Sequence, residues 1–546
     1  MSFPALPSGR ALRAALFLHG AALFAFAYCL APLYYSNQNQ YFLHGLAAAG
    51  DGLLREDWLA NTRDPTPAFS ALVALTARFL HPWAFYVYQA LLLGAYAAAM
   101  LGLFAAVAGP DVTRRRWPVF VALLIAVHAA LPRWLSYRWL GHDYPWFLQA
   151  GVAGQYVLGS MLQPSVFGVL LVVAVCLFVR GRPLLAGACV AVAATAHATY
   201  LLPGAMLTLG FLTALLREGR RREALTVGAV TLVLSLPITM YTLLAFRPTT
   251  PETFARAQEI LVNVRIPHHT RPDLWLDPVA KWQITWALLG VALSGPSRLR
   301  ITLAVAFALS AALTLLQVAT GSLTMALLFP WRVSIVLVPI ATVVVLSRLV
   351  AIRFLPLEGR AAWAAAGTLV AVLVGAGVWI MGARLAFYTD PDEVPVMNFV
   401  RQTKRAGDVY FLPVRVPDLA ATTRGSLSSD FKPLPDKQSD RRIIPVDLQR
   451  FRLYTGAPIF VDFKSVPYKD TDVLEWYARL GLARTALEEL RAGRLSKALD
   501  EMRPRGITHQ VLPAGTELRG PGVEQVYGDE HYRVYRLTRQ PPTADK

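Results

Sequence analysis

Charged residues are scarce in this 546-residue chain, where they make up 16% of the sequence; a soluble globular domain usually carries about a quarter. Acidic residues are the scarcer sign, with 35 Asp and Glu against 53 Lys and Arg, which gives a net charge of +18 at pH 7. Hydrophobic residues reach 55%. Long segments that never meet water explain this balance, so the sequence excludes an ordinary soluble protein and indicates a polytopic membrane protein.

Cysteine is also rare, and the three cysteines, Cys29, Cys176 and Cys189, all lie in apolar segments. These three positions indicate neither a set of disulfide bonds nor the cysteine spacing of a metal site. The C-terminal part of the chain has neither a phosphate-binding glycine loop nor a nucleophile elbow. The sequence therefore offers no support for a disulfide-stabilised fold, a cysteine metal site, a P-loop or a hydrolase triad.

Apolar segments of about membrane-spanning length recur along the first 388 residues. The first follows Arg10 and Arg13 and continues past the small triplet at Ala25–Ala27, so its length predicts a membrane helix and not a cleaved signal peptide. We expect eleven transmembrane helices, near 14–33, 82–108, 118–131, 161–179, 183–197, 199–216, 224–246, 279–295, 301–319, 329–350 and 361–387.

Arginines gather in the short connections between these segments, at 114–116, 217–222, 298–300 and 348–360. The positive-inside rule places such connections, and with them the N-terminus, in the cytoplasm. The long loops 34–81, 132–160 and 247–278 then lie on the outer face of a bacterial inner membrane, where we expect the functional site. Because the basic residues belong to these membrane loops, no nucleic-acid partner is expected.

The composition changes near residue 389, which predicts two domains, a transmembrane domain at 1–388 and an extracytoplasmic α/β domain at 389–546. The second region holds 25 basic and 22 acidic residues, so most of the positive surplus belongs to the first. Strand-like runs lie at 409–413, 459–463, 507–512 and 532–537, and helical periodicity lies at 394–404, 473–481 and 483–502.

The first outer loop concentrates acids next to aromatic residues and a histidine. Asp51, Asp57 and Asp64 follow closely on Tyr41 and His44. Carboxylates in such a setting can act as a general base or bind a divalent cation. The alternative is a solvated amphipathic helix lying on the membrane, with Asp64 in a turn. The sequence identifies no cofactor with certainty, and it does not decide whether a divalent cation binds.

Basic residues in later outer segments are candidates for binding an anion. Arg265, His268 and His269 lie in the third long loop, and Arg332 lies where the tenth predicted helix begins. Together they can bind a phosphate or pyrophosphate at the level of the lipid headgroups. The alternatives are an ordinary interfacial loop and an arginine that extends its side chain to the membrane surface.

This arrangement of many spans, an acid-bearing first outer loop and a C-terminal α/β domain resembles the GT-C superfamily of membrane glycosyltransferases. The resemblance implies transfer of a sugar from a polyprenyl-phosphate donor at the outer face, with membrane lipids as the other partners. It implies Asp57, Asp51 or Asp64 as the base. It also implies binding of the lipid phosphate by Arg265, His268, His269 and Arg332, with Tyr41 and His44 beside the substrate.

One stretch departs from that family pattern. Many members place an acid directly after the first span, whereas this chain has Asn37, Gln38, Asn39 and Gln40 there, and none of these takes a proton at neutral pH. Either the base has moved to Asp51, Asp57 or Asp64, or this protein keeps the scaffold without the reaction. Two alternatives to an enzyme are therefore kept: a non-catalytic scaffold that docks a glycan or a partner, and, independently of this stretch, a transporter of a lipid-linked substrate.

Overall fold

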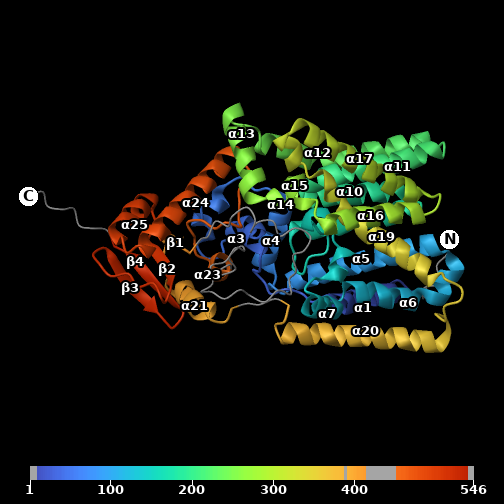
Figure 1. Ribbon diagram of the computed structural model, residues 1–546, viewed down its shortest axis with the longest axis horizontal. Coiled ribbons are helices and arrows are strands. Elements are labelled where there is room, and N and C mark those ends of the chain that lie inside the picture. Colours follow the sequence, from blue (N-terminus) through green and yellow to red (C-terminus); the bar gives the residue numbers. More distant parts are fainter. Residues whose placement is uncertain (1–8, 387–389, 414–449, 539–546) are drawn as a thin grey trace, which may run out of the picture.

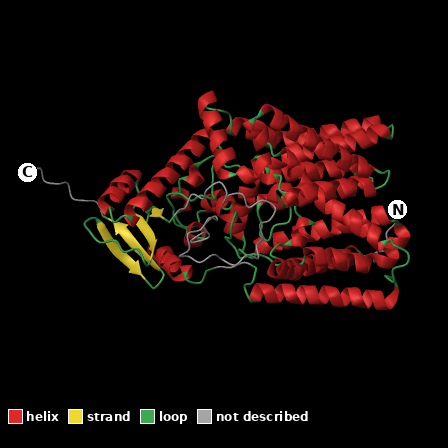
Figure 2. Ribbon diagram, viewed as in Figure 1, coloured by secondary structure: helices red, strands yellow, loops and turns green. Residues whose placement is uncertain are grey.

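The computed structural model describes residues 9–386, 390–413 and 450–538. It consists of a large helical bundle and a smaller C-terminal unit of helices and one sheet (Figure 1). The N-terminus lies at the end of the bundle far from the C-terminal unit. Figure 2 shows that the strands are confined to the C-terminal unit.

The bundle is built from apolar helices, because a chain in lipid must satisfy its backbone hydrogen bonds within each segment. Its helices are α1 (Arg10–Tyr28), α5 (Ala84–Ala108), α6 (Pro110–His128), α7 (Ala130–Leu140), α9 (Val169–Val179), α10 (Pro183–Ala196), α11 (Leu201–Arg217), α12 (Arg221–Ala245), α16 (Pro278–Leu293), α17 (Arg298–Thr320), α19 (Ser334–Val350) and α20 (Gly359–Gly382).

Among the described residues, seven helices are long and apolar enough to cross a membrane, or eight if α6 and α7, bent by 47°, form one span. The expected number of eleven is larger than this. Each expected segment does coincide with a helix, but three of these helices are short: residues 164–179, α10 with 14 residues and α16 with 16. A membrane span needs about 20 residues. The apolar composition therefore predicted where the helices lie but not how long they are.

The arginine-rich connections lie together at one end of the bundle. The Arg116 Nε atom is 2.8 Å from Glu358 Oε1, and the Arg298 guanidinium contacts Glu218. Arg348 donates to the Leu293 carbonyl at 2.8 Å. Connections between different helix pairs thus touch one another, and the N-terminus lies at the same end (Figure 1).

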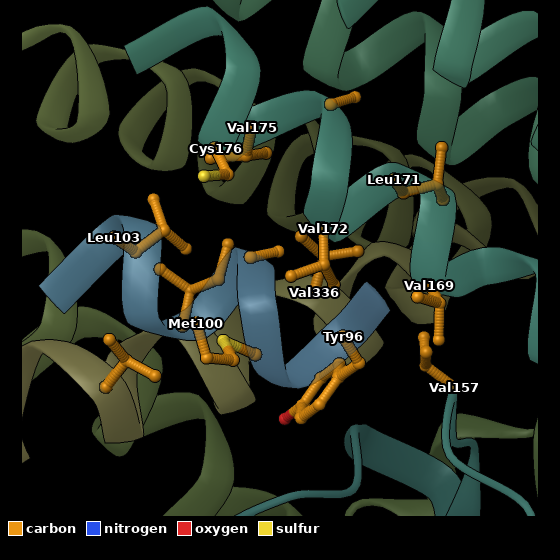
Figure 3. Close-up of a cluster of buried hydrophobic side chains, with 14 of the residues drawn as sticks. Tyr96, Met100, Leu103, Val157, Val169, Leu171, Val172, Val175, Cys176 and Val336 are labelled. Carbon is orange, nitrogen blue, oxygen red and sulfur yellow. The ribbon is translucent and has the colours of Figure 1, made fainter. Parts of the chain in front are cut away.

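The core of the bundle is formed where α5, α9 and α19 meet. Figure 3 shows Met100 and Leu103 of α5 facing Val172 and Cys176 of α9, with Val336 of α19 behind them. These side chains are at most 7% exposed. The buried core therefore belongs to helices from separate parts of the sequence.

The long loops fold into short helices at the opposite end of the bundle, between it and the C-terminal unit (Figure 1). The first contains α2 (Gln38–Tyr41), α3 (Leu43–Ala49), η1 (Leu54–Glu56), η2 (Leu59–Asn61) and α4 (Pro67–Phe79). The second contains α8 (Tyr144–Phe147) and η3 (Val152–Gly154), and η4 (Pro164–Gly168) leads into α9. The third contains α13 (Pro251–Ile260), η6 (Leu261–Arg265), α14 (Pro267–Thr270) and α15 (Pro272–Trp275).

Three further short elements connect bundle helices at this end. They are η5 (Ala198–Tyr200), α18 (Leu323–Leu327) and η7 (Pro330–Val333). The turn of η6 is a π-helix, a form that occurs mostly as single turns, often at functional sites.

The C-terminal unit has a four-stranded sheet in the order β1-β2-β4-β3. Its strands are β1 (Tyr410–Phe411), β2 (His509–Pro513), β3 (Val523–Gly528) and β4 (Tyr532–Leu537), and its helices are α21 (Glu393–Thr403), α23 (Phe451–Thr455), α24 (Asp470–Arg491) and α25 (Leu495–Met502), followed by the 3-10 turn η9 (Arg503–Arg505). β1 and β2 are parallel, and β4 is antiparallel to both β2 and β3.

Three details of this unit differ from the sequence-based expectation. The run 459–463 makes only one bridge, between Ile459 and Tyr410, because other groups take its backbone hydrogen bonds. The sequence pattern does not predict β3, since it is a largely exposed edge strand with few apolar residues. The expected break in the helical region near residue 482 is also wrong, because α24 continues to Arg491.

The C-terminal unit packs directly on the long loops. Ile260 and Leu261 share a buried cluster with Phe460 and Trp476 of the C-terminal unit. Leu453 of α23 joins a second cluster with Phe42 and Leu54 of the first loop. The loops and the C-terminal unit therefore form one continuous structure.

Close packing of α20 on α1 depends on one glycine. A Cβ atom at Gly377 would collide with the Phe26 carbonyl oxygen, which is backbone and cannot move aside cheaply. We expect Gly377→Val to separate the two helices and to cost about 1 to 3 kcal/mol of stability. At Gly375 on the same helix, a Cβ atom would have no neighbour within 4 Å.

Gly375→Val is therefore the matched control, and thermal unfolding in detergent is the measurement. Equal melting temperatures for the two variants would show that the contact between α1 and α20 does not limit stability.

Candidate functional site

The amide side chains after α1 are buried and hold the first loop in place. Gln38 accepts a hydrogen bond from the Tyr34 N–H at 2.6 Å and donates to the Leu162 carbonyl at 3.0 Å. Gln40 donates to the Val466 carbonyl and to the Tyr468 hydroxyl, both at 3.2 Å. The stretch that departs from the family pattern thus connects the first loop to the second loop and to the C-terminal unit.

Asp57, the first of the three candidate bases, is fully buried. Its Oδ2 atom lies 3.0 Å from Arg452 Nε and accepts from the Ile459 N–H at 3.0 Å. Its Oδ1 atom accepts from the Leu59 N–H at 3.0 Å. All of these partners are fixed, so the carboxylate fastens the C-terminal unit to the first loop.

Asp51 is exposed and makes no ion pair with any residue that the structure describes. Partial desolvation raises the pKa of Asp51, while the charges of Arg401 and Lys404 on the C-terminal unit oppose this rise. Asp51 therefore faces α21 and the segment that follows it.

Asp64 is half-buried beside α12. Its Oδ1 atom accepts from the Thr66 N–H at 2.8 Å, and its carbonyl accepts from the Tyr241 hydroxyl at 2.7 Å. A small cleft is lined by the neighbours Arg63 and Pro65 and extends to Tyr41 and His44. Of the three expected acids, Asp64 is the one next to this cleft.

No group of three or more His, Cys, Asp and Glu residues that could hold a metal ion occurs in the described ranges. The three acids have separate partners. The divalent cation left open by the sequence thus has no ligand set there.

Arg265 is 8% exposed and ends the π-turn η6. Its Nη2 atom donates to the Lys464 carbonyl, and its guanidinium lies 5.5 Å from the centre of the Phe463 ring. Its Nε atom is buried and lacks a hydrogen-bond partner. No described acid forms a salt bridge with it, so this buried charge is only partly compensated.

Arg332 lies in η7 and is held between aromatic rings. Its guanidinium carbon is 5.3 Å from the centre of the Tyr200 ring and 5.8 Å from that of Phe329. Its Nη2 atom is 3.4 Å from His197 Nε2, while its Nε atom is buried without a partner. Arg332 also makes no salt bridge within the described part of the chain.

A strained turn directs Arg332 inward. Phe329 has φ of 51°, a left-handed conformation that costs a non-glycine residue roughly 1 to 2 kcal/mol. Because Pro330 follows, the conformations open to Phe329 are restricted further. Strain of this kind collects at functional sites.

His269 lies against the same two arginines and is neutral. Burial, with smaller contributions from Arg332 and Arg265, lowers the pKa of His269 to about 4. Its Nδ1 atom lies 2.8 Å from the Ala153 carbonyl oxygen, which can only accept. The proton of the neutral ring is therefore on Nδ1, and Nε2 is left as an acceptor.

Tyr41 connects the first loop to both arginines. Burial raises the pKa of Tyr41 well above its usual value, the nearby Tyr468 raises it further, and the charges of Arg332 and Arg265 oppose this rise. The Tyr41 ring meets the His197 ring edge-on at 5.9 Å. We call Tyr41, His197, Arg265, His269, Arg332 and Tyr468 the cationic cluster.

The structure thus brings together four of the expected substrate-binding residues: Tyr41, Arg265, His269 and Arg332. His268 stacks on His269 at 4.0 Å, and His44 lies at the adjoining cleft with Nε2 3.2 Å from the Thr62 carbonyl oxygen. The sequence does not predict His197 and Tyr468 there, since nothing in their local sequence distinguishes them from ordinary core or loop residues.

The buried ion pair of Asp57 generates a prediction about stability. Asp57→Asn removes the more deeply buried of the two carboxylates that compensate Arg452, and breaking a buried pair in this way typically costs about 3 to 5 kcal/mol. We expect a lower melting temperature and faster proteolytic release of the C-terminal unit.

The control for this prediction is Asp51→Asn, which removes the same charge at an exposed position and should leave both readouts unchanged. Wild-type stability in Asp57→Asn would mean that the ion pair does not hold the C-terminal unit.

Comparison with known proteins gives a short family match and a structural similarity that extends over most of the chain. Residues 436–483 match the family described as "Domain of unknown function (DUF6798)", and the described part of this segment, 450–483, includes α23 and the start of α24. Comparison with curated proteins gives no significant sequence match.

Among solved structures, the chain is similar to ArnT from Cupriavidus metallidurans, in a crystal structure with bound undecaprenyl phosphate. The alignment covers 97% of this chain and 98% of ArnT, with 13% identity and a TM-score of 0.38. The aligned region therefore takes in both the helical bundle and the C-terminal unit of this chain.

Proposed function

We propose that this protein is a GT-C-like glycosyltransferase that takes its sugar from a polyprenyl-phosphate donor and binds the lipid phosphate at the cationic cluster. The main support for the proposal is the pair of guanidinium groups of Arg265 and Arg332, neither of which forms a salt bridge with an acid in the described ranges, whereas the buried Arg452 has two. Burying an uncompensated charge is costly. A phosphate group would supply the missing charge and several hydrogen-bond acceptors.

The position of the cluster supports a lipid-linked phosphate. Arg332 begins the apolar segment that leads into α19, and Arg265 lies in a loop that contacts the C-terminal unit. An anion here would lie at the end of the membrane helices, where the headgroup of a lipid lies. The polyprenyl chain would then extend along the bundle.

The proposed reaction uses a carboxylate opposite the departing phosphate. Asp64 removes the proton from an acceptor hydroxyl, whose oxygen forms a bond to the anomeric carbon of the sugar. The bond from that carbon to the phosphate oxygen breaks, and Arg265 and Arg332 stabilise the charge on the released lipid phosphate. Asp57 is assigned a structural role because its oxygens are already bonded.

The proposed orientation follows the positive-inside rule. The arginine-rich end and the N-terminus face the cytoplasm of a bacterium, and the C-terminal unit (389–546) lies outside the inner membrane as a separate domain. We propose eleven crossings, in which the short helices α10 and α16 and the segment 164–179 cross within the bundle where neighbouring helices cover them.

A second function, binding of a lipid-linked glycan without transfer, is favoured by the fixed amides of Gln38 and Gln40. They occupy the stretch where many GT-C enzymes have an acid, and they are bonded to backbone groups. This alternative uses the same cationic cluster to bind the lipid phosphate but includes no transfer of the sugar.

Phosphate binding is tested by replacing each arginine with methionine. We expect Arg332→Met and Arg265→Met each to weaken undecaprenyl phosphate binding about tenfold or more, since hydrogen bonds to charged groups contribute about 1.5 to 3 kcal/mol. Their unliganded forms should be at least as stable as wild type, because an uncompensated charge has been removed. Thermal shift during titration with the lipid measures both effects.

Arg452→Met provides the contrast, since it breaks a buried ion pair and should lower the melting temperature. Normal lipid binding in both Arg332→Met and Arg265→Met would rule out the cationic cluster as the phosphate site.

The proposed base is tested by Asp64→Asn, assayed by release of labelled sugar from a panel of polyprenyl-phosphate donors in membranes. Loss of a general base should lower kcat by about 10² to 10⁴-fold with the binding of donor unchanged. Asp51→Asn is the matched control. Activity in Asp64→Asn equal to wild type would exclude Asp64, and binding without turnover in wild-type protein would favour the second function.

A further inference from the structure

A second cavity lies on another side of the junction between the bundle and the C-terminal unit. It has a volume of about 850 Å³ and is lined by the ends of α1 and α20 and by α21, with Leu30, Met381, Arg384, Asn398 and Arg450 among its residues. None of these residues belongs to the cationic cluster. The cavity is therefore not the proposed donor site.

The cavity wall has an apolar side and a polar side. Leu30, Ile380 and Met381 at the ends of the membrane helices make an apolar side. Arg384, Arg450 and Asn398 make a polar side, and none of the described lining residues is acidic. The Nε atom of Arg450 is buried and has no hydrogen-bond partner.

Arg384 stands at a position where glycine is normally favoured. α20 ends in a Schellman motif, in which the Leu385 N–H donates to the Ile380 carbonyl at 3.1 Å and the Arg384 N–H donates to the Met381 carbonyl at 3.2 Å. Arg384 occupies the left-handed position of this motif, with φ of 54°. An arginine there costs the chain roughly 1 to 2 kcal/mol relative to an unstrained residue, so its side chain has a use that a glycine would not supply.

We propose that this cavity binds an anionic membrane lipid, with the phosphate of the headgroup between Arg384 and Arg450 and the acyl chains against Leu30, Ile380 and Met381. Charge complementarity identifies the headgroup, and the apolar side at the ends of two membrane helices identifies a lipid. Asn398 lies on the C-terminal unit and Met381 on the bundle, so the bound lipid joins the two parts. This site is independent of the function proposed above.

The test uses the full-length protein in detergent, titrated with phosphatidylglycerol, with thermal shift and native mass spectrometry as readouts. We expect saturable stabilisation by phosphatidylglycerol, weakened about tenfold in Arg450→Gln. Arg384→Gly should have opposite effects on the stability of the unliganded protein and on lipid binding. It should raise the melting temperature without lipid, because the strained residue becomes glycine, and it should weaken lipid binding to a similar extent as Arg450→Gln.

Controls separate this site from other anion sites. Arg405→Gln removes an exposed charge outside the cavity, and Arg332→Met alters only the cationic cluster, so both should bind phosphatidylglycerol like wild type. Equal stabilisation by phosphatidylcholine or by inorganic phosphate would overturn the assignment to an anionic lipid. Unchanged phosphatidylglycerol binding in Arg384→Gly and Arg450→Gln would overturn the site itself.

Discussion

The ion pair of Asp57 and Arg452 is the contact on which the junction between the two parts of the molecule depends. Both side chains are at most 2% exposed, and each is fixed by further groups, Asp57 by the Leu59 and Ile459 N–H groups and Arg452 by Asp462. Buried charges are stable only when they are paired, and here two carboxylates lie within 3.2 Å of the Arg452 guanidinium. The pair therefore fixes the position of α23 against the first loop, and with it the surface that closes over Tyr41 and Arg265.

The contrast between the two kinds of buried arginine explains the assignment of roles. Arg452 has carboxylate partners and serves the structure. Arg265 and Arg332 are also largely withdrawn from water, but their contacts are carbonyls, rings and a histidine. A charge held in such surroundings would be stabilised most by a ligand of opposite sign, and the binding role proposed for these two arginines rests on this difference.

The residues with a strained backbone lie at the same end of the bundle as the proposed sites. Six non-glycine residues in the described ranges have left-handed backbone: Cys29, Tyr34, Ser36, Ala153, Phe329 and Arg384. All six lie at the end of the bundle that meets the C-terminal unit. Ala153 supplies the carbonyl that orients His269, Phe329 precedes Arg332, and Arg384 lines the second cavity. The regular helices behind them provide the stability that such local strain requires.

The membrane part of this protein can be predicted from its composition, because exposure to lipid constrains composition directly. Each expected apolar segment coincides with a helix, and the connections rich in arginine, such as those of Arg116 and Arg298, meet at one end. The strand at 532–537 also has its predicted bounds, and three of its six residues, Tyr532, Val534 and Tyr535, are buried. These features depend on neighbours close in sequence.

The grouping of candidate residues into one site follows from tertiary packing and not from any local pattern. Asp57 is a suitable base by its place in the sequence, but Arg452, from the far end of the chain, occupies its oxygens. Tyr41, Arg265 and Arg332 come from three separate loops, and the C-terminal unit interacts with the first two of them through Tyr468 and the Lys464 carbonyl. Contacts between residues distant in sequence depend on how helices pack, and composition and periodicity carry no information about such pairs.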